Sequence, residues 1–119
     1  MYTEDGRNPY TEKYFYQYID LESWAKKYLI EEISKNFDGG LCSQYFYKDV
    51  DEDGIALLYA GPVWDYDCSL GNVDRSVRNP EGMLICYSNR VYDPDSGNTA
   101  FENRWFPQLC RHEAFMNEV

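Results

Sequence analysis

A single long helical segment followed by a β-hairpin constrains the fold of this chain more than any other feature of its sequence. Asp20 is a favourable N-cap, and Glu22 adds negative charge in the first turn that would follow it. Apolar side chains then recur at helical spacing along one side, at Leu21, Trp24, Tyr28, Leu29 and Ile33. The pattern predicts a helix over residues 21–36 that is ended by Gly39-Gly40, because glycine readily adopts the left-handed conformation.

Two strand-like runs follow the glycine pair, at residues 43–48 and 55–60, and both are rich in aromatic or branched side chains. The second run is the more apolar, so we expect it to be the more buried. The acidic stretch 49–54 between them begins like a calcium-binding EF-hand loop, but its twelfth position is Ala60 instead of glutamate. We therefore expect a charged hairpin turn at residues 49–54.

The second half of the chain has a weaker pattern. Residues 71–100 contain several Asn-Pro, Asp-Pro and glycine turns, so we expect little regular structure there. Residues 104–119 return to a helical pattern, carried by Trp105, Phe106, Leu109, Phe115 and Met116. A chain of 119 residues has room for one domain with a modest core. The predicted fold class is α+β: one long helix, a hairpin, an irregular aspartate-bearing loop, and C-terminal helices.

The charge balance narrows the classes of partner. The chain has 21 Asp and Glu against 11 Lys and Arg, which gives a formal net charge of -10. Such a surface repels phosphate backbones and anionic lipids, so we expect no nucleic acid partner, whereas divalent cations are favoured. No apolar run approaches the roughly 20 residues that a membrane-spanning helix needs, so we expect no membrane span.

The cysteines do not form the pattern of a structural zinc site. Cys42, Cys68, Cys86 and Cys110 include no C-x-x-C pair, and the chain has a single histidine, His112. We expect four free, mostly buried thiols, and disulfide bonds are the alternative if the protein is exported. His112 stands between arginine and glutamate, a setting typical of a solvated helix residue instead of a catalytic one.

Three aspartates stand at positions that suit phosphoryl transfer. Asp38 follows the predicted helix, and Asp65 and Asp67 follow the second strand-like run. Each of them alone is typical of an ordinary turn. Together they match a reaction in which one carboxylate accepts the proton of the nucleophile and another holds magnesium against nucleotide phosphates. The order along the chain therefore favours a phosphotransferase.

Several motifs carry a resemblance to a known family. They lie at residues 18–24, 32–38, 43–49, 61–67, 71–72 and 109–115. These segments resemble the C-terminal part of the CotH kinase family, atypical protein kinases related to the bacterial spore coat protein H and found also in clostridial surface and cellulosome-associated proteins. The resemblance spans nearly the whole chain. It implies the C-terminal lobe portion of an atypical protein-kinase-like fold, and a bacterial surface, extracellular or spore coat location.

The resemblance also implies roles for particular residues. Asp38 matches the aspartate of the family's catalytic loop, the counterpart of the general base of protein kinases. Asp65 matches the magnesium-binding aspartate, and Asp67 is expected to be a second ligand. Ser43 stands where an ordinary kinase has a metal-binding asparagine, so we assign it to the cofactor site. The implied reaction uses ATP with Mg or Mn to phosphorylate Ser or Thr hydroxyls of a protein substrate.

The chain has no glycine-rich phosphate loop, which the family reaction requires. We therefore expect residues 1–119 to be a C-terminal fragment of a CotH-like kinase domain that is inactive in isolation and able to self-associate through an exposed apolar face.

Two other functions compete with the kinase. The first alternative is a non-catalytic carbohydrate- or protein-binding module of a bacterial surface or cellulosome-associated protein, in which exposed Tyr and Trp rings stack on sugars. A glycoside hydrolase is weaker, because Asp65 and Asp67 belong to one short segment and cannot face each other across a sugar.

Overall fold

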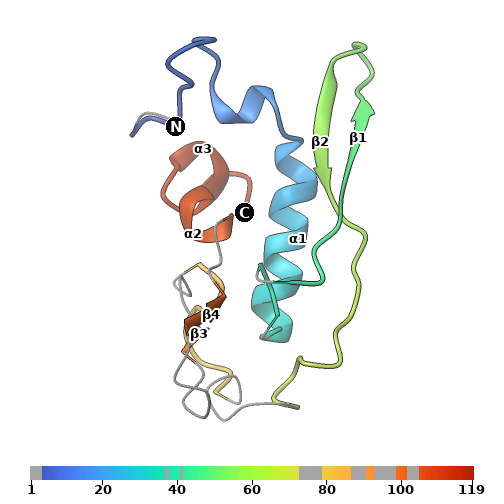
Figure 1. Cartoon of the computed structure of the whole chain (residues 1–119), viewed down its shortest axis with the longest axis vertical. Helices are drawn as coiled ribbons and strands as arrows, with labels where there is room; N and C mark the ends of the chain where they lie inside the picture. The colour runs from blue at the N-terminus through green and yellow to red at the C-terminus, as the bar shows by residue number, and fades with distance from the viewer. Residues whose placement is uncertain are drawn as a thin grey trace.

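The computed structural model describes residues 4–36, 38–40, 42–72, 79–86, 91–92, 99–101 and 105–119. Its elements are a 3-10 helix η1 (Phe15–Gln17), the helix α1 (Leu21–Ser34), strands β1 (Phe46–Val50), β2 (Ala56–Ala60), β3 (Val91–Tyr92) and β4 (Thr99–Phe101), and helices α2 (Phe106–Leu109) and α3 (Glu113–Met116). Helix α1 lies between the β1–β2 hairpin and the α2–α3 pair (Figure 1). The predicted α+β class is confirmed.

The start of α1 is fixed as the sequence predicts. Asp20 Oδ1 accepts a hydrogen bond from the Ser23 backbone N–H at 2.8 Å, which satisfies one of the free donors of the first turn. Ser23 Oγ accepts a hydrogen bond from the backbone N–H of Ala60 at 3.1 Å. Asp20 and Tyr18 also exchange backbone hydrogen bonds with Leu58. The helix cap is therefore attached directly to β2.

The predicted end of α1 at Gly39-Gly40 is wrong. The helix ends at Ser34, and Lys35 takes the left-handed conformation (φ 49°, ψ 46°) that the sequence assigned to glycine. This conformation costs a non-glycine residue roughly 1–2 kcal/mol. The Lys35 ammonium lies 3.1 Å from Glu32 Oε1 and also donates to the Gly82 carbonyl, and these contacts offset the cost.

The predicted apolar side of α1 is only partly buried. Trp24 and Tyr28 are in the core, but Leu29 is exposed and Ile33 is 76% exposed. The helix instead buries two carboxylates, Glu31 and Glu32. The orientation of α1 is therefore set by aromatic packing together with polar contacts, and the apolar pattern alone does not predict it.

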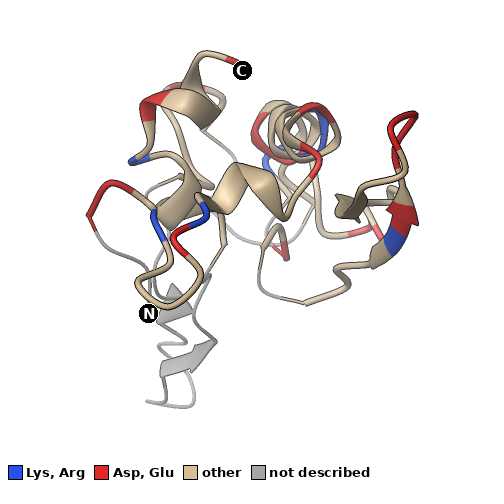
Figure 2. Ribbon diagram, turned by 90° about the horizontal axis from the view of Figure 1, so that it is seen from above, with Lys and Arg blue, Asp and Glu red and all other residues tan. Residues whose placement is uncertain are grey.

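The hairpin forms where the sequence predicts it. β1 pairs antiparallel with β2 in a register that runs from Phe46 opposite Ala60 to Val50 opposite Ala56. β1 is mostly exposed, whereas β2 is half-buried to buried after its exposed first residue, Ala56, so the predicted difference in burial is confirmed. In the acidic turn between them (Figure 2), Asp51 Oδ1 accepts the backbone N–H groups of two later turn residues. The stretch is a charged hairpin turn, as predicted.

The prediction of little regular structure over residues 71–100 is confirmed for the part of this region that the structure describes, where the strand residues belong to a short hairpin. β3 pairs antiparallel with β4, with Val91 opposite Phe101 and Tyr92 opposite Thr99. Strands of two and three residues are too short to give a recognisable alternation in sequence.

The C-terminal helical pattern breaks into two short helices, α2 and α3. His112 separates them as the N-cap residue of α3, and its ring lies 4.7 Å from the ring of Phe15. The prediction of a solvated helical His112 is therefore wrong, because the N-terminal segment packs over it. A Cβ atom at Gly6 would lie only 2.7 Å from the Phe15 ring, so this close packing requires glycine.

The core is largely aromatic. Among the described residues it includes Phe15, Trp24, Ala25, Tyr28, Ala60, Ile85, Phe106 and Phe115. Trp24 stacks on Phe46 at 4.9 Å between ring centroids and meets Phe106 edge-on at 6.2 Å. Its indole N–H donates to the Leu58 carbonyl at 3.0 Å, so the polar tip is satisfied. Trp24 therefore joins α1 to both hairpin strands and to α2.

All four cysteines are free thiols, as predicted. The expectation that they are mostly buried is wrong, because Cys42 is exposed and Cys68, Cys86 and Cys110 are half-buried. Within the part of the chain that the structure describes, no helix is long and apolar enough to cross a membrane.

Trp24→Ala should lower the free energy of unfolding by about 3–5 kcal/mol, because it removes a buried ring shared by three elements. Urea denaturation followed by circular dichroism measures this loss. Tyr10→Ala is the control, since Tyr10 is 90% exposed and its replacement should change stability by less than about 0.5 kcal/mol. Equal effects of the two substitutions would contradict the assigned role of Trp24.

Candidate functional site

Asp38 lies in the turn directly after α1. Its backbone N–H donates to Asn36 Oδ1 at 3.3 Å, and its side chain is half-buried. Asn36 is itself buried, and its Nδ2 donates to Glu31 Oε2 at 2.8 Å. A Cβ atom at Gly39 would lie 2.8 Å from Glu31 Oε2 and from Ile85 Cδ1. Gly39 is therefore needed for close packing beside Asp38, and not for ending the helix.

Ser43 and Asp65 meet although they are 22 residues apart in the chain. Ser43 Oγ donates a hydrogen bond to Asp65 Oδ2 at 2.9 Å. Both residues have left-handed backbones, with φ of 51° at Ser43 and 62° at Asp65. Such conformations cost non-glycine residues roughly 1–3 kcal/mol, and they cluster at ligand-binding and catalytic sites. The structure thus brings together two of the residues that the sequence assigned to the cofactor and metal.

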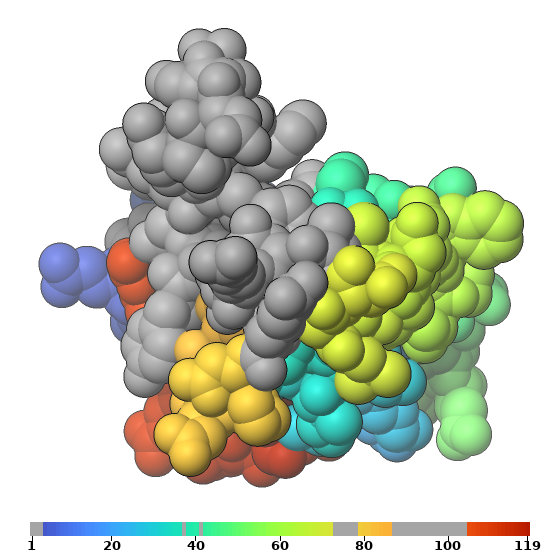
Figure 3. Space-filling model, turned by 90° about the horizontal axis from the view of Figure 1, so that it is seen from below, coloured from blue at the N-terminus to red at the C-terminus, as the bar shows by residue number. Residues whose placement is uncertain are grey.

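Asp67 is exposed and stands two residues further along the same loop. The Asn72 side chain donates to its backbone carbonyl at 2.7 Å, which closes this end of the loop. The loop continues to Leu70, whose backbone N–H donates to the Ser34 carbonyl at 2.7 Å. The segment 61–72 therefore lies against the C-terminal end of α1, on the face shown in Figure 3.

The candidate carboxylates contribute to the raised pKa values of two thiols, Cys42 and Cys68. Desolvation, a hydrogen bond to Asp38, and the charges of Asp38, Cys68 and Asp65 raise the pKa of the Cys42 thiol to about 11. Desolvation, a hydrogen bond to Asp67, and the charges of all three aspartates raise the pKa of Cys68 to about 11. The charges of Asp38, in the loop after α1, and of Asp65, in the loop after β2, thus both raise the pKa of each thiol.

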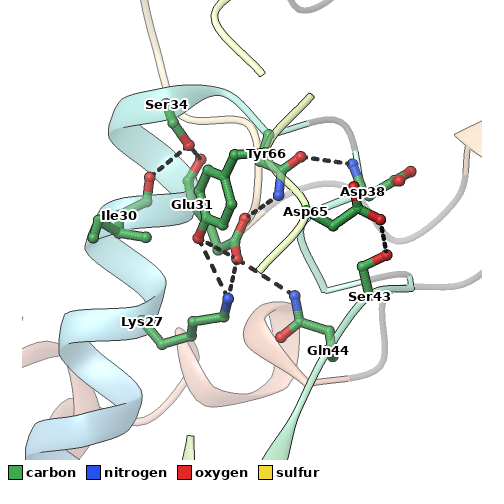
Figure 4. Close-up of polar contacts among 10 residues, drawn as sticks. Lys27, Ile30, Glu31, Ser34, Asp38, Ser43, Gln44, Asp65 and Tyr66 are labelled. Carbon is green, nitrogen blue, oxygen red and sulfur yellow. Dashed lines mark hydrogen bonds and ion pairs between the residues drawn. The ribbon is translucent and has the colours of Figure 1, made fainter. Parts of the chain in front are cut away.

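Behind this site lies a buried ion pair that sequence analysis missed. Lys27 Nζ lies 2.7 Å from Glu31 Oε1, and the two side chains are 2% and 0% exposed. The Tyr66 hydroxyl donates to Glu31 Oε1 at 2.7 Å, and Gln44 Nε2 donates to the same oxygen at 3.4 Å (Figure 4). Burial, this hydrogen bond and the charge of Glu31 raise the pKa of Tyr66.

The spacing of Lys27 and Glu31 was the only signal of this pair in the sequence. A lysine and a glutamate four residues apart on a helix usually form an exposed pair of small energetic effect. The burial of this pair becomes visible only in the tertiary structure, where the loop after α1 and the loop after β2 pack over the helix.

The donor atoms suit a hard divalent cation. Asp65 and Asp67 supply carboxylate oxygens, and Ser43 supplies a hydroxyl oxygen, which are ligand types that Mg²⁺ prefers. In nucleotide sites Mg²⁺ is held by one or two carboxylates together with phosphate oxygens and water. Among the described residues, no group of three or more histidine, cysteine or carboxylate side chains is arranged to hold a metal ion. The residues fit a metal shared with a nucleotide.

A family model described as CotH kinase protein matches residues 3–119 of the chain. The chain belongs to the CotH kinase family. Searches of curated proteins and of solved structures each gave no match. Membership in the CotH family confirms the resemblance drawn from the motifs and places the chain among kinase-like proteins. The matched region includes both site loops of this CotH chain, with Asp38 and Ser43 in the first and Asp65 and Asp67 in the second.

Asp38→Asn should increase the alkylation rate of Cys42 several-fold at pH 8.5, because it removes a negative charge that raises the pKa of the thiol. Iodoacetamide labelling followed by peptide mass spectrometry measures the rate at this cysteine. Asp53→Asn, in the hairpin turn, is the matched control and should leave the rate unchanged. An unchanged rate in Asp38→Asn would show that Asp38 does not lie beside Cys42 in solution.

Proposed function

We propose that this CotH chain supplies the catalytic and metal-binding loops of a kinase site that transfers phosphoryl groups from ATP to Ser or Thr hydroxyls of a protein. In this proposal the chain forms part of the C-terminal lobe of a kinase-like domain. The observation that carries the proposal is the hydrogen bond of Ser43 to Asp65, since it unites two loops that phosphoryl transfer requires together. Family membership supports the same class of reaction.

Asp65 is the proposed metal ligand, with Asp67 as a second carboxylate and Ser43 beside it. Asp65 has a left-handed backbone, and its carboxylate accepts the hydrogen bond from Ser43. Mg²⁺ or Mn²⁺, when bound, would neutralise charge on the nucleotide phosphates. Asp67 is exposed two residues further along the same loop.

Asp38 is the proposed general base. Its role is to accept the proton of the attacking hydroxyl, which is the task of the catalytic-loop aspartate in protein kinases. The backbone hydrogen bond to Asn36 fixes the turn that carries it. The charges of Asp38 and Asp65 both contribute to the raised pKa values of Cys42 and Cys68, which supports assigning the base and the metal ligand to one site.

Asp65→Ala should abolish saturable binding of Mg²⁺ or Mn²⁺ in a calorimetric titration, because it removes the main charged ligand. Asp38→Ala should weaken binding less, since Asp38 acts on the nucleophile and only adds to the local negative charge. Asp53→Ala is the control, with one acidic charge removed from the distant hairpin turn. Full metal affinity in a folded Asp65→Ala variant would refute the proposed ligand.

A second candidate function is binding of carbohydrate. Trp64, which is 57% exposed, meets the half-exposed ring of Tyr45 edge-on at 6.0 Å between centroids. The ring of Tyr47 is also half-exposed and stacks on Tyr59 at 5.1 Å. Exposed aromatic rings of this kind offer an apolar face and a polar tip, which suits the faces of sugar rings.

If the chain binds carbohydrate, Trp64→Ala should abolish affinity for oligosaccharides and Asp65→Ala should leave it nearly unchanged. Affinity electrophoresis in gels that contain soluble polysaccharide measures both variants. Under the kinase proposal, Asp65→Ala should lose metal affinity and Trp64→Ala should keep it, because the Trp64 ring provides no metal ligand. If polysaccharide slows the Trp64→Ala variant in the gel as much as it slows the wild-type chain, the Trp64 ring does not bind sugar.

A further inference from the structure

We propose that Glu31 is the positioning residue of this site, whose buried carboxylate holds the Asp38 loop and the Asp65 loop in one fixed arrangement. The inference rests on the proposed function for what that arrangement does. Whether Glu31 holds the two loops can be tested separately from whether the loops form a kinase site.

The first loop is attached through Glu31 Oε2. This oxygen accepts a hydrogen bond from the side chain of Asn36 at 2.8 Å, and Asn36 Oδ1 in turn accepts the backbone N–H of Asp38. The close approach of Gly39 to the same carboxylate leaves no room for a side chain there. One side-chain amide therefore connects Glu31 directly to the turn of the proposed base.

The second loop is attached through Glu31 Oε1. The Tyr66 hydroxyl donates to this oxygen at 2.7 Å, and Tyr66 stands between Asp65 and Asp67 in the chain. Gln44, the neighbour of Ser43, donates to it at 3.4 Å. Among the described residues, Asn36, Gln44 and Tyr66 hydrogen-bond to the Glu31 carboxylate from outside α1, and each stands within two positions of a proposed site residue (Figure 4).

Lys27 makes this use of a buried carboxylate feasible. Its ammonium pairs with Glu31 at 2.7 Å, lies 3.3 Å from the Tyr66 hydroxyl oxygen, and sits 5.2 Å from the centre of that ring. A buried ion pair is weak evidence for stability alone, but it can specify one arrangement of its neighbours.

The next residue of α1 provides a matched comparison. Glu32 is also buried, pairs with Lys35 at 3.1 Å, and accepts the backbone N–H groups of Leu84 and, at 2.8 Å, Ile85. It therefore holds the segment 82–85, which carries none of the proposed site residues. Two neighbouring glutamates of similar burial and chemistry thus hold different loops.

The test compares Glu31→Gln with Glu32→Gln by hydrogen exchange mass spectrometry and by Mn²⁺ titration. Glu31→Gln should speed amide exchange in segments 36–44 and 61–67, with protection of the β1–β2 hairpin unchanged. It should also weaken Mn²⁺ binding about 10–100-fold, the usual effect of removing a group that orients metal ligands. Glu32→Gln should speed exchange only near residues 82–85 and keep the wild-type affinity for Mn²⁺.

The outcomes separate this inference from the proposed function. Wild-type exchange in both site segments of Glu31→Gln would overturn the positioning role, whatever the metal affinity. Absence of Mn²⁺ binding by the wild-type chain would refute the proposed function. Amide exchange in segments 36–44 and 61–67 of Glu31→Gln would still decide the positioning role. If Glu31→Gln unfolds as a whole, Tyr66→Phe takes its place: faster exchange confined to 61–67 supports the role, and unchanged exchange there overturns it.

Discussion

The buried carboxylate of Glu31 is the contact on which the arrangement of this chain depends. Removing an ion from water costs several kcal/mol, and this carboxylate is acceptable inside the protein only because Lys27 and three uncharged donors satisfy it. Those donors come from the two loops with the candidate site residues. The cost of burying the charge is therefore offset by contacts that also define the site.

Helix α1 acts as a scaffold with two kinds of contact. Trp24 and Tyr28 belong to the apolar core and pack against the hairpin and the C-terminal helices. Glu31 and Glu32, one turn further along, hold the irregular segments through hydrogen bonds. Aromatic packing thus fixes the regular elements, whereas buried charge fixes the loops, which have too few apolar side chains to pack by themselves.

Much of the fold was predictable because its causes are local. The Asp20 cap and the acidic hairpin turn depend on residues a few positions apart, and both form as predicted. The end of α1 was not predictable, because the left-handed Lys35 is supported by the distant Gly82 carbonyl. The His112 prediction failed for the same reason, since its partner Phe15 lies at the other end of the chain.

The sequence by itself determined the family, the order of the elements and the identity of the candidate residues, since motifs and local propensities are read directly from the chain. Only the tertiary structure decided that Ser43 meets Asp65 and that the Lys27–Glu31 pair is buried. A pair of charges on a helix has the same spacing whether water or protein surrounds it. Burial depends on which loops fold over the helix, and that is a property of the whole chain.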